Sequence, residues 1–189
     1  MDRAVSIQCK TTQYKVPFGD TACTAVALIF ARLALEGIPA VEDLDTIIRA
    51  GGMLWKKWSD GTPDMHAMSF WSELSKCFPT VMKGMNVSFE VNGFMDGEPN
   101  EDFMVEPIES ALGRIKEPAS AVITINGGSY GAYFDDGKAY LFDSHGGRKP
   151  SDNATLWGWD TTKDLKSFFD DKALCTSEYS MVVFQSAIR

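Results

Sequence analysis

The 189-residue sequence has no hydrophobic run long enough to cross a membrane. A membrane-spanning helix needs about 20 predominantly apolar residues, whereas the longest apolar stretch, residues 22–35, is shorter and contains Arg32. The N-terminal residues also lack an apolar core followed by a small-residue cleavage site, which a secretory signal would have. We therefore expect residues 22–35 to form a buried helix, and we expect no membrane partner.

Basic residues are too few for a typical nucleic-acid-binding protein. Eighteen Lys and Arg stand against 26 Asp and Glu, which gives a formal net charge of −8 at pH 7. Because proteins bind nucleic acid by neutralising phosphates with Lys and Arg, we expect no nucleic-acid partner. The composition, 44% hydrophobic and 23% charged, is that of a globular protein, and the length fits one monomeric domain over residues 1–189.

Cysteine pairs with the spacing of a metal site are also absent. The four cysteines are scattered along the chain without a CxxC pair, so the sequence predicts neither a zinc site nor a dense disulfide framework. We interpret all four as reduced thiols of a cytosol-like compartment, and we expect no metal or other cofactor. They are Cys9, Cys23, Cys77 and Cys175.

Apolar periodicity places helices in the first part of the chain and strands in the second. The expected helices are one from Ala22 that stops at Gly37, one at 43–50 that ends at Gly51-Gly52, and others at 65–76, 104–116 and 162–169. The expected strands are 119–126, 130–134, 138–143 and 179–186. Asp136-Gly137 predicts a tight hairpin turn, because both central residues must tolerate positive φ. Helices followed by an antiparallel sheet indicate an α+β fold.

Cys23 is a candidate nucleophile because it lies where a loop becomes the long apolar helix. The first turn of a helix carries unpaired amide groups and the positive end of the macrodipole, and both lower the pKa of a thiol. Its neighbours Ala22 and Ala25 leave room for a second molecule. The alternative is that Cys23 is a small buried hydrophobic residue, as most free cysteines are.

His145 is the better of two candidate bases. Side chains alternate along a strand, so Asp143 and His145 are expected on one face while Ser144 points away. A carboxylate beside an imidazole fixes its tautomer and stabilises the imidazolium. The only other histidine, His66, also follows an aspartate by two positions, Asp64, but it lies in the expected helix 65–76, where residues two apart do not share a face. The alternative for residues 143–147 is a surface turn, in which these residue types are common.

The order of these residues resembles one family of cysteine proteases. Cysteine comes first, histidine last, and the acid two positions before the histidine, whereas in most papain-like enzymes the third residue follows the histidine. This order resembles the ubiquitin-specific cysteine protease domain at the N-terminus of herpesvirus large tegument proteins, and the wider tegument-like deubiquitinase class. The similar blocks are Gln13-Tyr14, Gly19-Asp20-Thr21-Ala22-Cys23-Thr24-Ala25-Val26-Ala27-Leu28 and Phe142-Asp143-Ser144-His145.

The resemblance implies a papain-like cysteine protease fold with N-terminal helices packed on a C-terminal antiparallel sheet. It implies hydrolysis of the bond after the C-terminal glycine of ubiquitin by a Cys23–His145–Asp143 triad. We expect a cytoplasmic location, which for a viral protein or an effector would be the host cytoplasm or nucleus. The partner would be ubiquitin or a ubiquitin chain. An upstream glutamine would donate to the oxyanion; Gln13 fits this role, and Gln8 is the alternative.

The implied substrate tail is extended and ends in two glycines, so it needs a narrow channel. Gly127, Gly128 and Ser129 could let backbone approach backbone there, and we also assign Ser144 to substrate binding. The alternative for 127–129 is an ordinary turn. The tryptophans of residues 55–58 and 157–159 are candidate partner anchors or core residues.

Three rival functions remain compatible with the sequence. A protease for another ubiquitin-like modifier and a Cys-His-Asp acyltransferase would share the triad and differ in the tail pocket or the acceptor. A non-catalytic interaction module on the same fold would keep Cys23 buried and unreactive.

Overall fold

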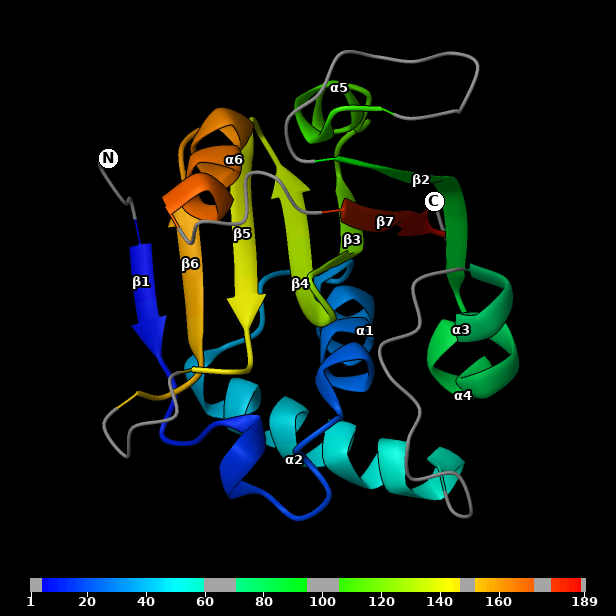
Figure 1. Cartoon of the computed structure of the whole chain (residues 1–189), viewed down its shortest axis with the longest axis vertical. Coiled ribbons are helices and arrows are strands. Elements are labelled where there is room, and N and C mark those ends of the chain that lie inside the picture. The colour runs from blue at the N-terminus through cyan, green and yellow to red at the C-terminus, as the bar shows by residue number, and fades with distance from the viewer. Residues whose placement is uncertain (1–4, 60–70, 95–105, 147–151, 172–177, 188–189) are drawn as a thin grey trace.

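A seven-stranded antiparallel sheet forms the centre of the molecule (Figure 1). The computed structural model describes residues 5–59, 71–94, 106–146, 152–171 and 178–187. The strand order is β1-β6-β5-β4-β3-β7-β2, and every neighbouring pair is antiparallel. The strands are β1 (Val5–Gln8), β2 (Met85–Phe94), β3 (Ala119–Ile125), β4 (Gly128–Asp135), β5 (Lys138–Asp143), β6 (Thr155–Trp159) and β7 (Glu178–Ser186).

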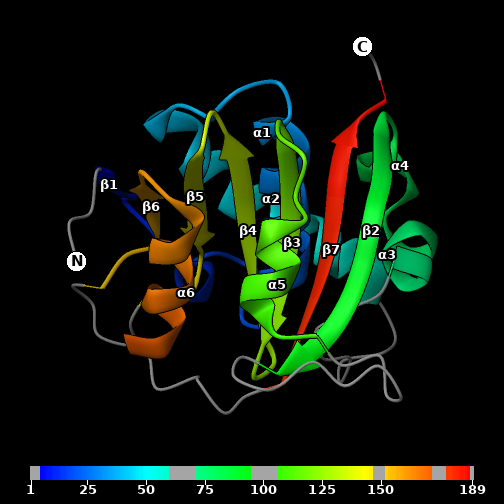
Figure 2. The ribbon, with the colours of Figure 1, turned by 90° about the horizontal axis from the view of Figure 1, so that it is seen from above.

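Helices cover both faces of this sheet. Figure 2 shows α1 and α2 on one side, and α5 and α6 on the other. No helix in the described part of the chain is long and apolar enough to span a membrane. The helices are the short 3-10 helix η1 (Gln13–Lys15), α1 (Cys23–Ala34), α2 (Val41–Ser59), α3 (Trp71–Cys77), α4 (Pro79–Met82), α5 (Ile108–Gly113) and α6 (Thr162–Asp171).

Two buried hydrophobic clusters, one on each face, hold the layers together. Every residue of β3 is buried, which explains why five of its seven residues are apolar. Val122 belongs to the cluster under α1 and α2, whereas Ile123 and Ile125 belong to the cluster under α5 and α6. Each such side chain contributes about 1.5–3 kcal/mol when fully buried, so the strand stabilises both layers at once.

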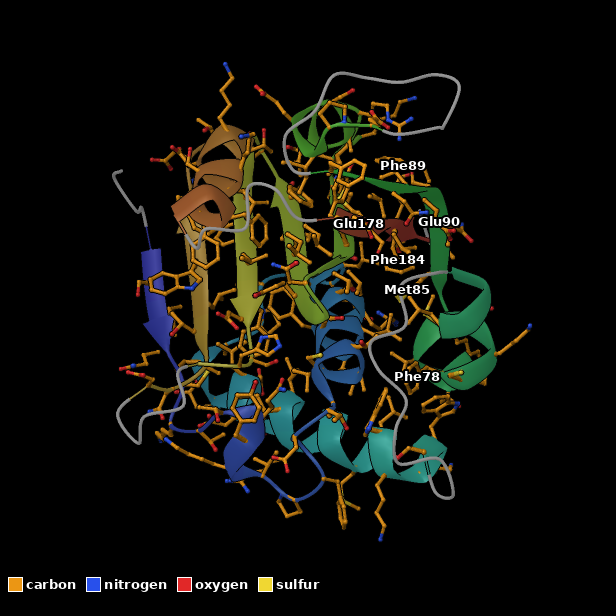
Figure 3. The ribbon with its side chains drawn as sticks, viewed as in Figure 1. Phe78, Met85, Phe89, Glu90, Glu178 and Phe184 are labelled. Atoms are coloured by element: carbon orange, nitrogen blue, oxygen red, sulfur yellow. The ribbon has the colours of Figure 1, made fainter. Side chains whose placement is uncertain are left out.

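At the β2–β7 end of the sheet, side chains also pack into hydrophobic clusters on both faces (Figure 3). Phe184 from β7, Met85 from β2 and Phe78 before α4 belong to the cluster shared with α1. Phe89 of β2 packs against the opposite cluster, and the Arg114 guanidinium lies 4.4 Å from its ring centre. The edge strand is therefore anchored on both faces.

The α+β class and the antiparallel sheet are confirmed, but the expected end of the second helix is wrong. Helix α2 continues through Gly51 and Gly52 to Ser59. A Cβ on Gly51 would lie 2.3 Å from Val26 Cγ2, and one on Gly52 would lie 2.5 Å from the Pro17 carbonyl oxygen. The glycines therefore serve close packing of α2 against α1 and its preceding loop. They do not stop the helix.

Other predicted elements are close to the observed ones. Strand β5 matches its predicted bounds, and β3, β4 and β7 differ only at their ends. The expected helices at 65–76 and 104–116 become α3 and α5, and their first parts, 65–70 and 104–105, lie outside the described residues. Strands β2 and β6 were not predicted.

Two hairpin turns share one geometry. Asp136 and Gly137 join β4 to β5 with φ values of 52° and 75°, as the Asp-Gly pair predicts. Asn126 and Gly127 join β3 to β4 with φ values of 51° and 75°. Positive φ at both central residues is typical of a type I′ turn. The β3–β4 turn therefore holds two strands tightly and leaves Gly128 and Ser129 at the start of β4.

The tryptophans of residues 55–58 and 157–159 pack against other aromatic rings, with Trp55 and Trp159 buried and Trp58 and Trp157 half-buried. Trp55 is buried and lies 5.1 Å, between ring centroids, from Trp58, and both rings contact Phe78. Trp159 is buried, and Trp157 packs against Phe168. The core interpretation of these residues therefore holds.

Candidate active site

Helix α1 begins at the end of the sheet where β3 turns into β4 and β5 ends (Figure 1). The helix lies unusually close to β4, because a Cβ on Gly131 would be 2.9 Å from the Ala27 carbonyl oxygen and 2.6 Å from a ring carbon of Phe30. Cys23 is the first residue of α1 and is 6% exposed. The close packing of helix on strand holds this thiol over the start of β4.

His145 is oriented by Asp143. The Nδ1 atom of the ring lies 2.9 Å from Asp143 Oδ1, and the backbone N–H of His145 donates to the same oxygen at 3.0 Å. The two bonds fix both the ring and the backbone that carries it. With Nδ1 facing the carboxylate, the second ring nitrogen, Nε2, is left for the thiol.

The Cys23 thiol hydrogen-bonds the His145 ring, which completes a row of thiol, imidazole and carboxylate. Burial by itself would raise the pKa of Cys23, but the hydrogen bond and positive charge of His145, with further bonds from Ser129, hold this pKa below its usual 9.0. Burial by itself would lower the pKa of His145, but Asp143 and Cys23 outweigh it and raise that pKa to about 9. These directions favour a thiolate paired with an imidazolium.

Gln13 lies beside this row. Its side-chain oxygen accepts from the Ser144 hydroxyl at 2.7 Å, and its Nε2 donates to the Asp20 carbonyl at 3.4 Å. Its backbone N–H also donates to the Ser144 carbonyl at 3.0 Å. The structure therefore ties Gln13 to the neighbour of His145 on one side and to the loop before Cys23 on the other.

Gln8, the alternative oxyanion donor, lies elsewhere. It is the last residue of β1, is exposed, and pairs with Thr155. Among the described residues, its side chain makes no hydrogen bond to the thiol–imidazole row, whereas Gln13 is 1% exposed and bonded next to it. The placement favours Gln13.

Residues 127–129 form the β3–β4 turn and the first positions of β4. A Cβ on Gly128 would be 3.4 Å from both Cε1 and Nε2 of His145, so the start of β4 lies against the imidazole. Ser129 and Ser144 are both buried, and their hydroxyls bond within the protein. Any contact of these two serines with a substrate would therefore come from their backbone.

Two tyrosines flank the imidazole and were not predicted from the sequence. The ring centroids of Tyr130 and Tyr14 lie 5.3 Å and 6.4 Å from that of His145. Tyr130 also contacts Phe169 edge-on, whereas Tyr14 is 43% exposed. The available signal was adjacency: Tyr14 follows Gln13, and Tyr130 follows the Gly-Gly-Ser turn.

The remaining candidates lie apart from the site or outside the described residues. Cys9 is buried in the cluster under α2, and Cys77 is partly exposed in α3. His66, Cys175 and Gly147 lie outside the described residues. Among the described residues, no group of three or more His, Cys, Asp or Glu side chains could hold a metal ion.

The fold, compared with solved structures, is similar to that of a viral protease. The similar structure is the ubiquitin-specific protease encoded by murine cytomegalovirus tegument protein M48, in complex with a ubiquitin-based suicide substrate. The TM-score is 0.72 at 15% sequence identity, over 98% of this chain and 88% of that chain. Neither the protein-family models nor the curated proteins include a match to this chain. The similarity shows the fold, and the site has to be argued from its own geometry.

Proposed function

We propose that this chain is a cysteine-type ubiquitinyl hydrolase that cleaves the bond after the C-terminal glycine of ubiquitin. The observation that carries the proposal is the hydrogen-bonded row from Cys23 through His145 to Asp143 at the start of a helix. The fold similarity to a protease solved with a ubiquitin-based substrate supports the choice of substrate. The protein would act on ubiquitin or ubiquitin chains as a monomer.

In the first half of the reaction, the Cys23 thiolate attacks the carbonyl carbon of the terminal glycine and forms a tetrahedral oxyanion. Charge that develops on this oxygen is stabilised by donors aimed at it beforehand. The Cys23 backbone N–H and the amide of Gln13 are the donors we assign. The His145 imidazolium then gives its proton to the leaving amine, and the C–N bond breaks to leave a thioester.

In the second half, neutral His145 takes a proton from water as the water oxygen attacks the thioester carbonyl. The C–S bond breaks, the carboxylic acid of ubiquitin leaves, and the proton on His145 restores the ion pair with the Cys23 thiolate. Asp143 keeps its negative charge throughout and holds the imidazole in one tautomer. Atoms balance with one water consumed per bond cleaved.

The β3–β4 turn offers a reason for selecting a tail that ends in glycines. Gly128 lies against the His145 ring, where a Cβ would be 3.4 Å from Cε1 and Nε2, so the missing side chain leaves room beside the imidazole for a slim tail. Exposed Tyr14 also lies near the imidazole, with its ring centroid 6.4 Å from that of His145. We assign Gly127 and Gly128 to backbone contacts with the tail.

The decisive experiment is reaction with ubiquitin that carries a C-terminal electrophile, followed by mass-spectrometric mapping of the adduct. We expect one adduct, on Cys23, and none with Cys23→Ala. Cys9→Ala is the matched control, because it removes another buried thiol and should keep the adduct. Probes of other ubiquitin-like modifiers, run in parallel, identify a protease for a different tail.

Three outcomes would overturn the proposal. A probe adduct on a cysteine other than Cys23 would remove the proposed nucleophile. A Cys23 thiol that reacts with neither the ubiquitin probes nor iodoacetamide would indicate an inert thiol in an interaction module. A Cys23 that reacts and then transfers ubiquitin to an added amine faster than to water would indicate an acyltransferase.

A further inference from the structure

Three buried hydroxyl groups meet next to the nucleophile, from three different elements. Ser129 Oγ lies 2.9 Å from Thr24 Oγ1 and 2.9 Å from Thr124 Oγ1. Thr24 follows Cys23 in the first turn of α1, Thr124 lies near the end of β3, and Ser129 lies near the start of β4. Thr24 and Ser129 are fully buried, and Thr124 is 7% exposed. We call these three residues the hydroxyl cluster.

The position of Ser129 within the cluster restricts where its proton points. A hydroxyl has one hydrogen to donate and two lone pairs that accept. If both threonines donate to Ser129 Oγ, its two lone pairs are used and its hydrogen is left for a third partner. The Cys23 sulfur is the partner we assign, because Cys23 directly precedes Thr24, which bonds Ser129, and because bonds from Ser129 are among the causes that lower the pKa of Cys23.

The charge on Cys23 selects this arrangement. Hydrogen bonds to an ionised group are shorter and stronger than those between neutral groups. Two further donors behind Ser129 polarise its O–H and strengthen the bond that it makes to the sulfur. When Cys23 is protonated, its sulfur is a weak acceptor, and no strong acceptor then fixes the direction of the Ser129 O–H bond.

We propose that Ser129 donates its hydroxyl proton to the Cys23 thiolate, and that Thr24 and Thr124 are positioning residues that hold Ser129 in that orientation. This rests on the proposed function, in which the Cys23 thiolate is the nucleophile. Ser129 touches the reacting atom and is therefore a catalytic residue, although its side chain is buried from the substrate.

The hydroxyl cluster also links the nucleophile to the turn next to the imidazole. Ser129 directly follows Gly128, whose Cβ position is 3.4 Å from His145. Thr24 connects the same serine to the first turn of α1. The bonds therefore fix the spacing between the thiol, the imidazole and the β3–β4 turn.

The test is the pH dependence of Cys23 alkylation by iodoacetamide in the intact chain, without ubiquitin, with the modified residue identified by mass spectrometry. In Ser129→Ala we expect the midpoint to rise by about one pH unit, which means about tenfold less thiolate below the midpoint. Thr24→Val and Thr124→Val keep the side-chain volume and remove the hydroxyl. We expect each to raise the midpoint by a few tenths of a unit.

The matched control is Ser120→Ala. Ser120 is a fully buried serine of β3 whose hydroxyl has no hydrogen-bond partner among the described residues. Its removal should leave the Cys23 midpoint unchanged. Thr24→Ser and Thr124→Ser keep a hydroxyl at each position and should restore the midpoint of the unsubstituted protein.

An unchanged midpoint in folded Ser129→Ala overturns the inference, and so does an equal rise in Ser120→Ala. Circular dichroism shows whether Ser129→Ala folds. If it does not, the test rests on Thr24→Val and Thr124→Val, and unchanged midpoints in both overturn the inference. A raised midpoint in a chain that hydrolyses no ubiquitin conjugate supports the inference and refutes the proposed function. Hydrolysis of a ubiquitin conjugate together with an unchanged alkylation midpoint in Ser129→Ala supports the proposed function and refutes the inference.

Discussion

Cys9 and Cys23 are both buried thiols, yet their surroundings shift their pKa values in opposite directions. Cys9 is 3% exposed and Cys23 is 6% exposed. Burial raises the pKa of Cys9, the nearby Asp45 carboxylate raises it further, and the result is about 12. Burial acts in the same sense on Cys23, but His145 and Ser129 reverse it and the pKa is lowered. Cys23 can therefore be a nucleophile because it has partners that outweigh burial, whereas Cys9 has none among the described residues and the Asp45 carboxylate adds to the effect of burial.

The backbone around each cysteine explains which charge it meets. Cys9 follows β1, and the Asp45 carboxylate is held beside it because it accepts from the N–H groups of Lys10 and Thr11 at 3.0 Å and 3.2 Å. Cys23 begins a helix, and the imidazole that faces it is held by Asp143. In the first site the carboxylate acts on the thiol directly. In the second, an imidazolium stands between them.

The largest expected effect is loss of activity on removal of Cys23. Cys23→Ala should abolish hydrolysis of a ubiquitin–fluorophore conjugate, because no thiolate remains to form the thioester. Cys9→Ala should keep most activity, because the Cys9 thiol stays protonated at neutral pH. Initial rates measured on both variants make the comparison, and turnover retained in Cys23→Ala would refute the mechanism.

Removal of His145 comes next. His145→Ala should lower the hydrolysis rate by several orders of magnitude, because the thiolate loses its cation and the leaving amine loses its proton donor. It should also raise the pKa of Cys23 toward that of an ordinary buried thiol, which makes Cys23 resemble Cys9. Alkylation rates of both cysteines against pH measure this convergence.

The control for that experiment is the second histidine. His66→Ala should change the rate little, because His66 lies in the expected helix 65–76, where the spacing from Asp64 does not put the carboxylate on the same face as the imidazole. Equal losses for His66→Ala and His145→Ala, in protein shown to be folded, would contradict the assignment of the base.

A smaller effect is expected at Asp143. Asp143→Asn should lower the rate about tenfold or more, because an amide can hold the wrong tautomer of His145. The pKa of His145 is about 9 because the carboxylate favours the imidazolium, so loss of that charge lowers it. Since activity needs the imidazolium, the alkaline limb of the pH–rate profile should move below about pH 9.

Asp136→Asn is the matched control for Asp143→Asn. Asp136 lies in the β4–β5 turn at the other end of the same strand, and its substitution should leave the profile unchanged. Identical profiles and rates for the unsubstituted protein and Asp143→Asn would show that Asp143 is only a turn residue.

The sequence predicted what short-range chemistry determines. The helix start at Cys23, the Asp136-Gly137 turn and the Asp143–His145 pairing depend on residues close together in the chain, so their spacing was readable. The resemblance pointed to Gln13. The end of α2 was mispredicted because Gly51 faces a neighbour that only the tertiary structure supplies.

Long-range partners were not readable. Thr24, Ser129 and Thr124 come together across 105 and 5 positions of sequence, and nothing in their local pattern marks them as one cluster. The Asp45 carboxylate near Cys9 is likewise 35 positions from Lys10. Which charge a buried thiol meets is decided by packing, and so the contrast between Cys9 and Cys23 needed the structure.

The smallest expected effect is at Asp45, and it separates burial from charge. Burial is the larger cause of the raised pKa of Cys9 and Asp45 the smaller, so Asp45→Asn should lower that pKa only in part. An asparagine oxygen can still accept from the Lys10 and Thr11 amides, so the local structure should persist. In Asp45→Asn we expect Cys9 to react with iodoacetamide at pH 7 to 9 almost as slowly as it does in the unsubstituted protein. The reaction rate of Cys23 should not change. The reference rate is that of Cys9 in denaturant, where both causes vanish. If Asp45→Asn made native Cys9 react as fast as Cys23, charge would outweigh burial there, and the order of the two causes would have to be reversed.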